Sequence, residues 1–245
     1  AAALAAAVPA DRQRLHQLEE DPDMRPAARV PSEELLARWA PLAPVEPGAA
    51  VRVHHSADVF ALWQAWEEEA GSRQGVPYWA VPWPAAIAFS RLLAADPARV
   101  RGRVVLEIGC GGAAAAIAAS RAGAARVIAN DTDPAALHVA RLNAAANGVA
   151  LEFDDRDQAA TGLDESAAVI LVADLFYERG PAARMIEQLR RAAGRGVEVL
   201  VADAGRPFAP HTGVTLLATE EVAVNDDLEG TSQRIVRLLR LLGPS

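Results

Sequence analysis

The hydrophobic positions in the second half of this chain fall into two alternating kinds of segment. Short apolar runs without polar alternation are typical of strands buried on both faces of a parallel sheet. They cover residues 104–106, 127–129, 149–153, 167–173 and 197–202. Between them lie segments in which apolar residues recur at helical spacing, with the clearest at 134–147 and 181–193. This order of strands and helices predicts an α/β fold built on a mostly parallel sheet.

Two longer strand-like runs close the chain, at about 214–224 and 233–242. Turn-forming residues, Asn225-Asp226-Asp227 and Gly230, lie between them. These runs therefore predict a C-terminal antiparallel hairpin that completes a seven-stranded sheet.

The first 50 residues are rich in alanine, proline and charge, and we expect an N-terminal helical extension there. One short helix is expected over Asp11–Glu20, and a second begins after Pro31 with Ser32 as its N-cap. A strand at Val51–His55 then opens the main domain, expected at 51–245. Two further helices are expected at 58–70 and 85–95. The extension could be a lid, a docking piece or a loosely packed appendage.

A glycine turn follows the first buried run. Glu107-Ile108-Gly109-Cys110-Gly111-Gly112 leads into an alanine-rich helix that ends near Gly123. Gly109 and Gly111 would let the backbone turn tightly and lie close to a ligand, since no Cβ intervenes. The N-terminus of the next helix would direct free N–H groups at that ligand. An ordinary tight turn is the alternative.

An acidic residue follows the second apolar run, at a position suited to bind the ribose of a nucleoside cofactor. Asp131 follows the second run and lies 22 residues after Gly109. An acid at about this spacing can bind ribose hydroxyls. The cofactor could be a dinucleotide or S-adenosylmethionine (SAM). Glu107, placed two residues before Gly109, and Ala113 give a pattern that resembles motif I of class I SAM-dependent methyltransferases. The terminal hairpin, and the lack of residues for a separate substrate domain, also favour SAM.

An aromatic and proline-rich segment, Val76–Pro84, precedes this core. Tyr78, Trp79 and Trp83 could form a wall of the cofactor and substrate pocket. The alternative is an aromatic cluster that covers the edge of the sheet.

Polar residues follow the remaining strands, at the edge where open α/β sheets bind ligands. Asp155 or Arg156 could meet an adenine ring, although solvated loop charges would look the same. Asp174 and Tyr177 lie where the transferred methyl group should be, and a carboxylate there could orient an attacking amine. The alternative for Asp174 is an N-cap of the next helix.

Composition narrows the functional classes further. The formal net charge of −8 argues against a general nucleic-acid binder. The single cysteine, Cys110, fits a reducing cytoplasm, and a small residue in a tight turn is a more economical explanation than a reactive thiol. We expect no metal, since no histidine and cysteine cluster has ligand spacing. No apolar run approaches the ~18 residues of a membrane span, and the alanine-rich start lacks the basic residues of a signal peptide.

From about Val51 to Leu242 the chain resembles the lysine methyltransferases of the electron transfer flavoprotein β-subunit, which are class I, seven-β-strand methyltransferases. The matching stretches are Leu62-Trp63-Gln64 with Glu67-Glu68-Glu69, Pro77-Tyr78-Trp79-Ala80 with Trp83-Pro84, Ala88-Phe89-Ser90-Arg91, Asn130-Asp131-Thr132-Asp133-Pro134, Asp174-Leu175-Phe176-Tyr177-Glu178, and Asp203-Ala204-Gly205-Arg206-Pro207 with His211. The chain departs from the family at Ala85 and Ala86, where the family usually has two glycines.

The resemblance implies a Rossmann-like fold, SAM as methyl donor, Asp131 on its ribose, and a protein lysine accepted near Asp174. The predicted catalytic residues are Asp174 and Tyr177. The predicted cofactor-binding residues are Trp83, Glu107, Gly109, Gly111, Asp131, Asp155 and Asp174. The predicted substrate-binding residues are Tyr78, Trp79, Phe176, Arg206 and His211.

The sequence thus predicts a cytoplasmic SAM-dependent N-methyltransferase that acts on a lysine of a protein resembling the electron transfer flavoprotein β-subunit, without nucleic-acid or membrane partners. One alternative is an N- or O-methyltransferase of a small molecule such as a natural-product amine. Another is a SAM-binding module without catalytic activity.

Overall fold

A seven-stranded mixed sheet forms the centre of the protein. The computed structural model describes residues 29–224 and 230–244. The strand order is β5-β4-β3-β6-β7-β9-β8, and the first five strands are parallel. The hairpin of β8 and β9 joins β7 in antiparallel fashion. The strands are β3 Val104–Ile108, β4 Arg126–Asn130, β5 Glu152–Asp154, β6 Val169–Ala173, β7 Glu198–Asp203, β8 Val214–Ala223 and β9 Gln233–Leu241. The predicted fold class is confirmed.

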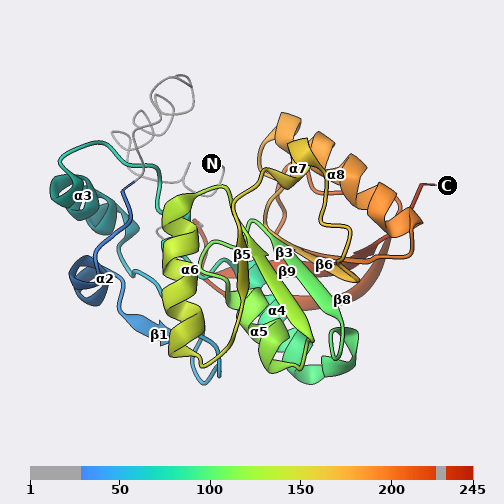
Figure 1. The fold of residues 1–245 in the computed structure, drawn as a ribbon, viewed down its shortest axis with the longest axis horizontal. Helices are drawn as coiled ribbons and strands as arrows, with labels where there is room; N and C mark the ends of the chain where they lie inside the picture. The colour runs from blue at the N-terminus through green and yellow to red at the C-terminus, as the bar shows by residue number, and fades with distance from the viewer. Residues whose placement is uncertain (1–28, 225–229, 245) are drawn as a thin grey trace.

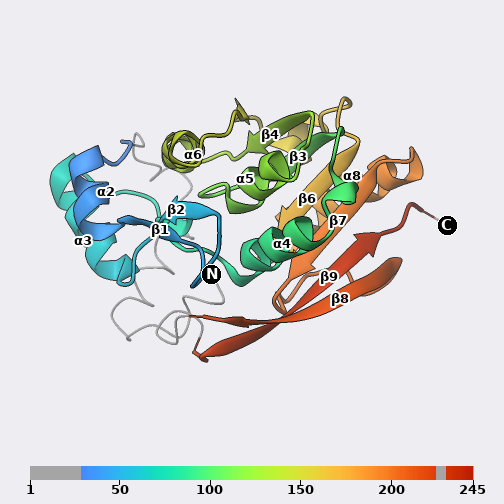
Figure 2. The same ribbon diagram turned by 90° about the horizontal axis from the view of Figure 1, so that it is seen from below.

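Helices cover both faces of this sheet (Figures 1 and 2). Three of them, α4 (Pro84–Ala95), α5 (Ala114–Arg121) and α6 (Pro134–Ala146), pack on one face. On the other face lie α7 (Gln158–Thr161) and α8 (Arg179–Gly194). The central strands are buried from both sides, which explains why their sequences show no polar alternation.

Three helices begin at the residues that their sequences indicate. Asp133 caps α6 by accepting from Ala135 N at 2.8 Å, with Pro134 as the first helical residue. Asp58 caps α3 (Val59–Ala70), and Gly71 ends it in the left-handed conformation. Ser32 caps α2 (Glu33–Trp39) by accepting from Leu35 N.

The N-terminal elements pack as one layer beside α6. They comprise α2, the paired strands β1 (Leu42–Pro44) and β2 (Arg52–His54), α3, and a short 3-10 helix, η2 (Tyr78–Ala80). Apolar side chains of α2, α3 and η2 form a third cluster that includes Ala135, Ala136 and Val139 of α6, whereas Val53 of β2 belongs to the cluster of α4 and α5. The domain boundary expected after residue 50 therefore falls between two paired strands. The helix predicted at 11–20 and the turn at 225–227 lie outside the described residues.

Several local predictions differ from the structure. The helix expected from Pro181 begins at Arg179, and the strand expected from Ala167 begins at Val169. The third central strand was expected from Val149 but begins at Glu152. Val149 N instead donates to Ala144 O, so residue 149 belongs to the C-terminal turn of α6 and cannot pair with β4. The strand β1 was not predicted, because the prolines around it suggested an irregular segment. It is an edge strand, where a missing N–H is tolerated at Pro44.

Candidate active site

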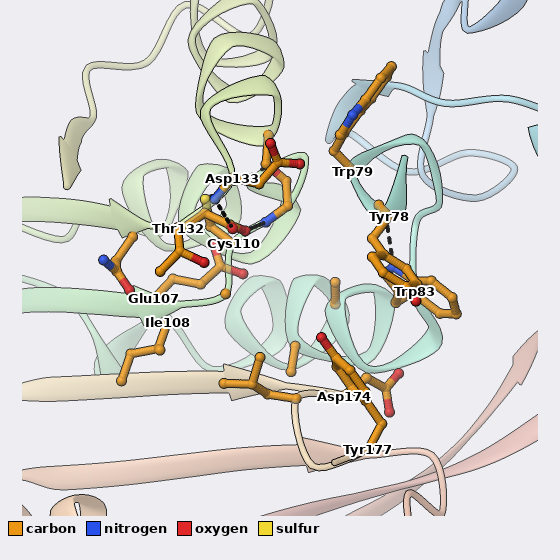
Figure 3. Close-up of a pocket in the computed structure, with 18 of the residues that line it drawn as sticks. Tyr78, Trp79, Trp83, Glu107, Ile108, Cys110, Thr132, Asp133, Asp174 and Tyr177 are labelled. Carbon is orange, nitrogen blue, oxygen red and sulfur yellow. Dashed lines mark hydrogen bonds between the residues drawn. The ribbon is translucent and has the colours of Figure 1, made fainter. Parts of the chain in front are cut away.

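A cavity of about 500 Å³ opens at the carboxyl ends of the central strands (Figure 3). The glycine loop after β3 forms one wall, and the segment Tyr78–Trp83 forms the opposite wall. The residues that follow β4 and β6 lie at its ends. This is the edge at which open α/β sheets bind their ligands.

The glycine loop is held in a conformation that requires its glycines. Gly109 and Gly111 have φ values of 68° and 50°, a region that side chains rarely adopt. A Cβ on Gly109 would also lie 2.7 Å from Leu175 Cδ1. Ala113 precedes α5 with a φ of 62° and is fully buried. The loop therefore presents backbone to the cavity, as predicted.

Asp131 joins this loop to the end of β4. Its Oδ2 accepts from Gly111 N at 2.8 Å, and its Oδ1 accepts from Asp133 N at 3.0 Å. Burial raises the pKa of this carboxyl group, while the backbone donors of Asp133, Gly111 and Thr132 oppose the rise. Each oxygen keeps a lone pair that can accept a hydroxyl of a ligand. Asp131 is thus suited to bind a ribose.

Glu107 lies at the base of the cavity and is 1% exposed. Its Oε2 accepts from Ala116 N at 2.7 Å. Burial raises its pKa to about 8, and the negative charge of Asp131 acts in the same direction. This carboxyl group is therefore largely protonated at pH 7 and half-ionised near pH 8.

Asp174 lies at the opposite end of the cavity, beyond β6. It is 6% exposed and accepts hydrogen bonds from Ala85 N (3.1 Å), Ala204 N (2.9 Å) and Arg206 Nε (3.0 Å). Burial raises its pKa, while Arg206 and the backbone donors lower it. The N-cap of α8 is Glu178, so Asp174 does not cap that helix. Instead it connects β6, α4 and the loop after β7.

Three half-buried aromatic rings line the mouth beside Asp174. The ring of Tyr78 lies 6.1 Å from Trp83 and 6.2 Å from Tyr177, between centroids. Trp83 Nε1 donates to Tyr78 O, and the Arg206 guanidinium lies 5.3 Å from the Trp83 ring. Of the predicted aromatic wall, Tyr78 and Trp83 lie here, and they are joined by Tyr177, which was predicted as a catalytic residue.

Trp79 contributes differently. It borders the cavity, but its side chain is 1% exposed and packs edge-on against Trp66 at 5.9 Å. Figure 3 shows its indole directed away from Asp174 and Tyr177. Its ring therefore holds the N-terminal layer together rather than facing a substrate.

Three other predicted site residues do not border the cavity. Phe176 is fully buried in the core beside α8. Asp155 and His211 are exposed outside the cavity lining. Arg156, the other residue considered for contact with the adenine ring, forms an ion pair with Asp154.

The structure brings other residues to the cavity that the sequence did not single out. Asp157 and Gln158 occupy the position expected of Asp155, because a short helix, α7, begins there with Asp157 as its N-cap. The pattern of an aspartate before a short apolar stretch could have indicated that cap. Val53 of β2 also borders the cavity, and only long-range packing places it there.

Cys110 is a free, buried thiol within the loop. Burial and the neighbouring carboxyl groups of Asp131 and Glu107 raise its pKa well above the ordinary value. A raised pKa disfavours the reactive thiolate. The structure thus favours Cys110 as a small residue in a tight turn.

Two negative observations concern the described ranges, 29–224 and 230–244. No helix there is long and apolar enough to cross a membrane. No group of three or more His, Cys, Asp or Glu residues there could hold a metal ion. The absence of a metal stays a prediction.

Comparison with known proteins identifies the relatives of this chain. A family model described as ribosomal protein L11 methyltransferase (PrmA) matches residues 91–198. The electron transfer flavoprotein β-subunit lysine methyltransferase of Xenopus laevis is 41% identical over 140 residues, which cover 56% of each chain. The human protein of the same name is 37% identical over 139 residues, covering 56% of this chain and 53% of its own. This chain spans about half the length of the curated relatives it matches.

A solved structure shows the same fold. A candidate RNA methyltransferase from Pyrococcus horikoshii superimposes with a TM-score of 0.50 at 14% sequence identity. The match covers 64% of this chain and 83% of that one. The resemblance inferred from the sequence is therefore confirmed: over its matched part this chain is similar to the electron transfer flavoprotein β-subunit lysine methyltransferases, and its fold is that of the class I methyltransferases.

Proposed function

We propose that this chain is a SAM-dependent N-methyltransferase whose acceptor is a lysine of a protein resembling the electron transfer flavoprotein β-subunit. The observation that carries the proposal is a single cavity with two different ends. One end joins Asp131 to the glycine loop, and the other joins Asp174 to Tyr78, Trp83 and Tyr177. The similarity to relatives of that name supports the choice of acceptor.

The residues of the cavity fit SAM. Asp131 would hold the ribose hydroxyls, and the backbone at Gly109 and Gly111 would lie against the amino-acid part. When bound, SAM supplies a methyl group activated by a positively charged sulfur. The cavity lining carries six carboxyl groups and two guanidinium groups, and even with Glu107 protonated the carboxylates outnumber the guanidinium groups, which suits a cationic ligand. They are Glu107, Asp131, Asp133, Asp157, Asp174, Glu178, Arg184 and Arg206.

The aromatic end of the cavity suits an alkylamine. Tyr78, Trp83 and Tyr177 offer an apolar passage for a lysine side chain and exclude water from its end. Oδ2 of Asp174 has one backbone donor, Ala85 N, and keeps capacity to accept from the amine. The amine must be neutral to react, so Asp174 would orient it rather than hold it as a cation. The main contribution of the protein to catalysis would then be to align the amine with the methyl group of SAM in a site that excludes water.

The direct test is methyl transfer to purified electron transfer flavoprotein β-subunit. Purified wild-type chain, labelled SAM and the β-subunit should give label in that protein, and mass spectrometry should place it on a lysine. Label that appears instead only in the small-molecule fraction of an extract would overturn the protein acceptor. SAM binding without transfer to any fraction would indicate a binding module.

Mutation of Asp174 tests its proposed role. Asp174→Ala should lower kcat by at least about 100-fold, a magnitude typical of a lost positioning and electrostatic group. SAM affinity should change much less, since Asp131 and the glycine loop remain. Asp155→Ala is the matched control, since this carboxylate is exposed outside the cavity and should leave both quantities near wild type. Equal losses of kcat and SAM affinity in Asp174→Ala would contradict the assignment.

One observation favours a small-molecule acceptor as the second candidate. Ala86 borders the cavity at a position where the resembling family usually has glycine. Its methyl group occupies space that the family leaves open, which could adapt the mouth to another amine. The extract experiment distinguishes the two acceptors.

A further inference from the structure

Strand β2 is bound on its outer edge by side chains rather than by another strand. Its inner edge pairs with β1. On the outer edge, Asn147 of α6 accepts from Arg52 N at 3.1 Å and donates to Arg52 O at 2.6 Å. One helical turn earlier, Asn143 Oδ1 accepts from His54 N at 2.8 Å. Two side-chain amides on one face of α6 therefore take the place of a neighbouring strand.

Asn143 makes a second contact that Asn147 does not make. Its Nδ2 donates to Gly112 O, in the glycine loop, at 2.9 Å. The side chain is fully buried. One amide group thus binds two segments, around residues 54 and 112, that are far apart in the sequence.

Both segments form walls of the cavity. Val53 of β2 and Gly112 each border it. Space between them is limited, because a Cβ on Gly112 would lie 3.1 Å from Trp79 O and 3.3 Å from Asn143 Nδ2. The position of the loop therefore depends on where the N-terminal layer is held.

We propose that Asn143 is a positioning residue for cofactor binding, which fixes the glycine loop against the β1–β2 hairpin. The inference rests on the proposed function, because it concerns the same SAM site. Its fully buried amide satisfies the half-buried groups Gly112 O and His54 N together, and loss of the amide would remove a hydrogen-bond partner from each. If Asn143 loses only its Nδ2 donor, the glycine loop should be released at Gly112 O, while the β1–β2 hairpin stays bound through His54 N.

The variant Asn143→Asp separates the two contacts. Burial raises the pKa of such a carboxyl group, so binding is compared with wild type from pH 7 to pH 10. Once ionised, the new carboxylate still accepts from His54 N but cannot donate to Gly112 O, and it repels that oxygen. We expect S-adenosylhomocysteine, used as the probe, to bind about tenfold more weakly by calorimetry, the effect of about one lost hydrogen bond. Hydrogen exchange at the His54 amide should stay slow.

Asn147→Ala is the matched control. It removes both contacts to Arg52 but leaves Gly112 O bound. Hydrogen exchange at the Arg52 amide should become faster, while the affinity for S-adenosylhomocysteine stays within about twofold of wild type. A low-pH rescue of Asn143→Asp would also support the proposal, since a protonated carboxyl group can again donate to Gly112 O.

Three results overturn the inference. One is that Asn143→Asp binds S-adenosylhomocysteine as tightly as wild type up to pH 10. Another is that Asn147→Ala weakens binding as much as Asn143→Asp does. Should Asn143→Asp fail to fold, Gly112→Ala tests the loop from the other side, with a fivefold or greater loss expected and an unchanged affinity overturning the proposal. A wild-type chain that binds neither SAM nor S-adenosylhomocysteine would instead overturn the proposed function itself.

Discussion

At the residue scale, Gly109 and Asp174 both adopt left-handed backbone at the end of a strand, with φ values of 68° and 50°. For glycine this conformation costs little, whereas for aspartate it costs about 1 kcal/mol or more. Three hydrogen-bond donors compensate Asp174 and hold it at the cavity. Such strain is sustained where the surrounding structure over-determines a residue, often at a functional site.

Replacement of Gly109 tests the need for this conformation. Gly109→Ala should lower the free energy of unfolding by about 1–2 kcal/mol and weaken SAM binding, because the loop must change its left-handed conformation and Leu175 must turn away from the added Cβ. Urea unfolding and calorimetry measure the two effects. Gly196→Ala is the control, since Gly196 has a φ of 91° with nothing within 4 Å of its added Cβ and does not border the cavity. It should show a similar loss of stability with unchanged affinity; equal loss of affinity in both variants would contradict the explanation.

Glu107 should make stability depend on pH. In the folded chain its pKa is about 8, against an ordinary value of 4.5, so the folded state holds a proton that the unfolded state releases. The free energy of unfolding therefore falls as pH rises from about 4.5 to about 8. Glu107→Gln should reduce the difference in stability between pH 5 and pH 9, measured by urea unfolding. Asp131, Asp133 and Asp174, with raised pKa values, retain part of the slope. An unchanged pH dependence in the variant would contradict this account.

At the element scale, α4 connects the N-terminal layer to the C-terminal hairpin through Arg91. Its guanidinium donates to both carboxylate oxygens of Glu46, in the loop between β1 and β2. It also donates to Glu220 Oε2 and Glu221 O of β8. One side chain thereby joins three elements that are distant in the sequence.

Removal of the Arg91 guanidinium should destabilise the contacts among α4, the β1–β2 loop and β8 together. Arg91→Met, which keeps most of the apolar stem, should lower the free energy of unfolding by about 1–3 kcal/mol, because several charge-assisted hydrogen bonds are lost. Arg191→Met is the control: its ion pair with Glu187 lies on the exposed side of α8 and should matter by less than about 0.5 kcal/mol. Urea unfolding of both variants is the measurement, and equal effects would show that Arg91 has no connecting role.

At the scale of the whole molecule, the third hydrophobic cluster makes the N-terminal layer part of the site. Trp66 and Trp79 pack with Ala135, Ala136 and Val139, which lie on α6 just after the end of β4 that carries Asp131. A ligand that contacts both the glycine loop and the aromatic wall should therefore stabilise the layer and the sheet together.

Unfolding measured with and without ligand tests whether the N-terminal layer and the sheet are stabilised together, and it also tests the choice of cofactor. S-adenosylhomocysteine at about 100 times its dissociation constant should stabilise the fold by about 2.7 kcal/mol. Hydrogen exchange should slow in α3 and α6 alike. NAD, as the control ligand, should have no effect. Stabilisation by NAD alone would support the dinucleotide alternative and contradict the SAM assignment.

Much of the fold was predictable because its signals are local. The buried strands, the caps at Ser32, Asp58 and Asp133, and the terminal hairpin each depend on residues close together in the sequence. Strand ends were less predictable. Residue 149 satisfies both helix and strand patterns, and only the bond from Val149 N to Ala144 O decides between them.

The sequence by itself determined that a glycine loop and an acid 22 residues later lie at one sheet edge, since consecutive parallel strands end at the same edge. Only the tertiary structure decided which side chains reach the cavity. Asp157 replaces Asp155, Phe176 turns into the core, and Asp174 is held by Ala85, Ala204 and Arg206. The physical reason is that loop side chains take their direction from local backbone angles and from partners distant in the sequence, such as those that bring Val53 to Gly112 through Asn143. Periodicity and spacing do not carry that information.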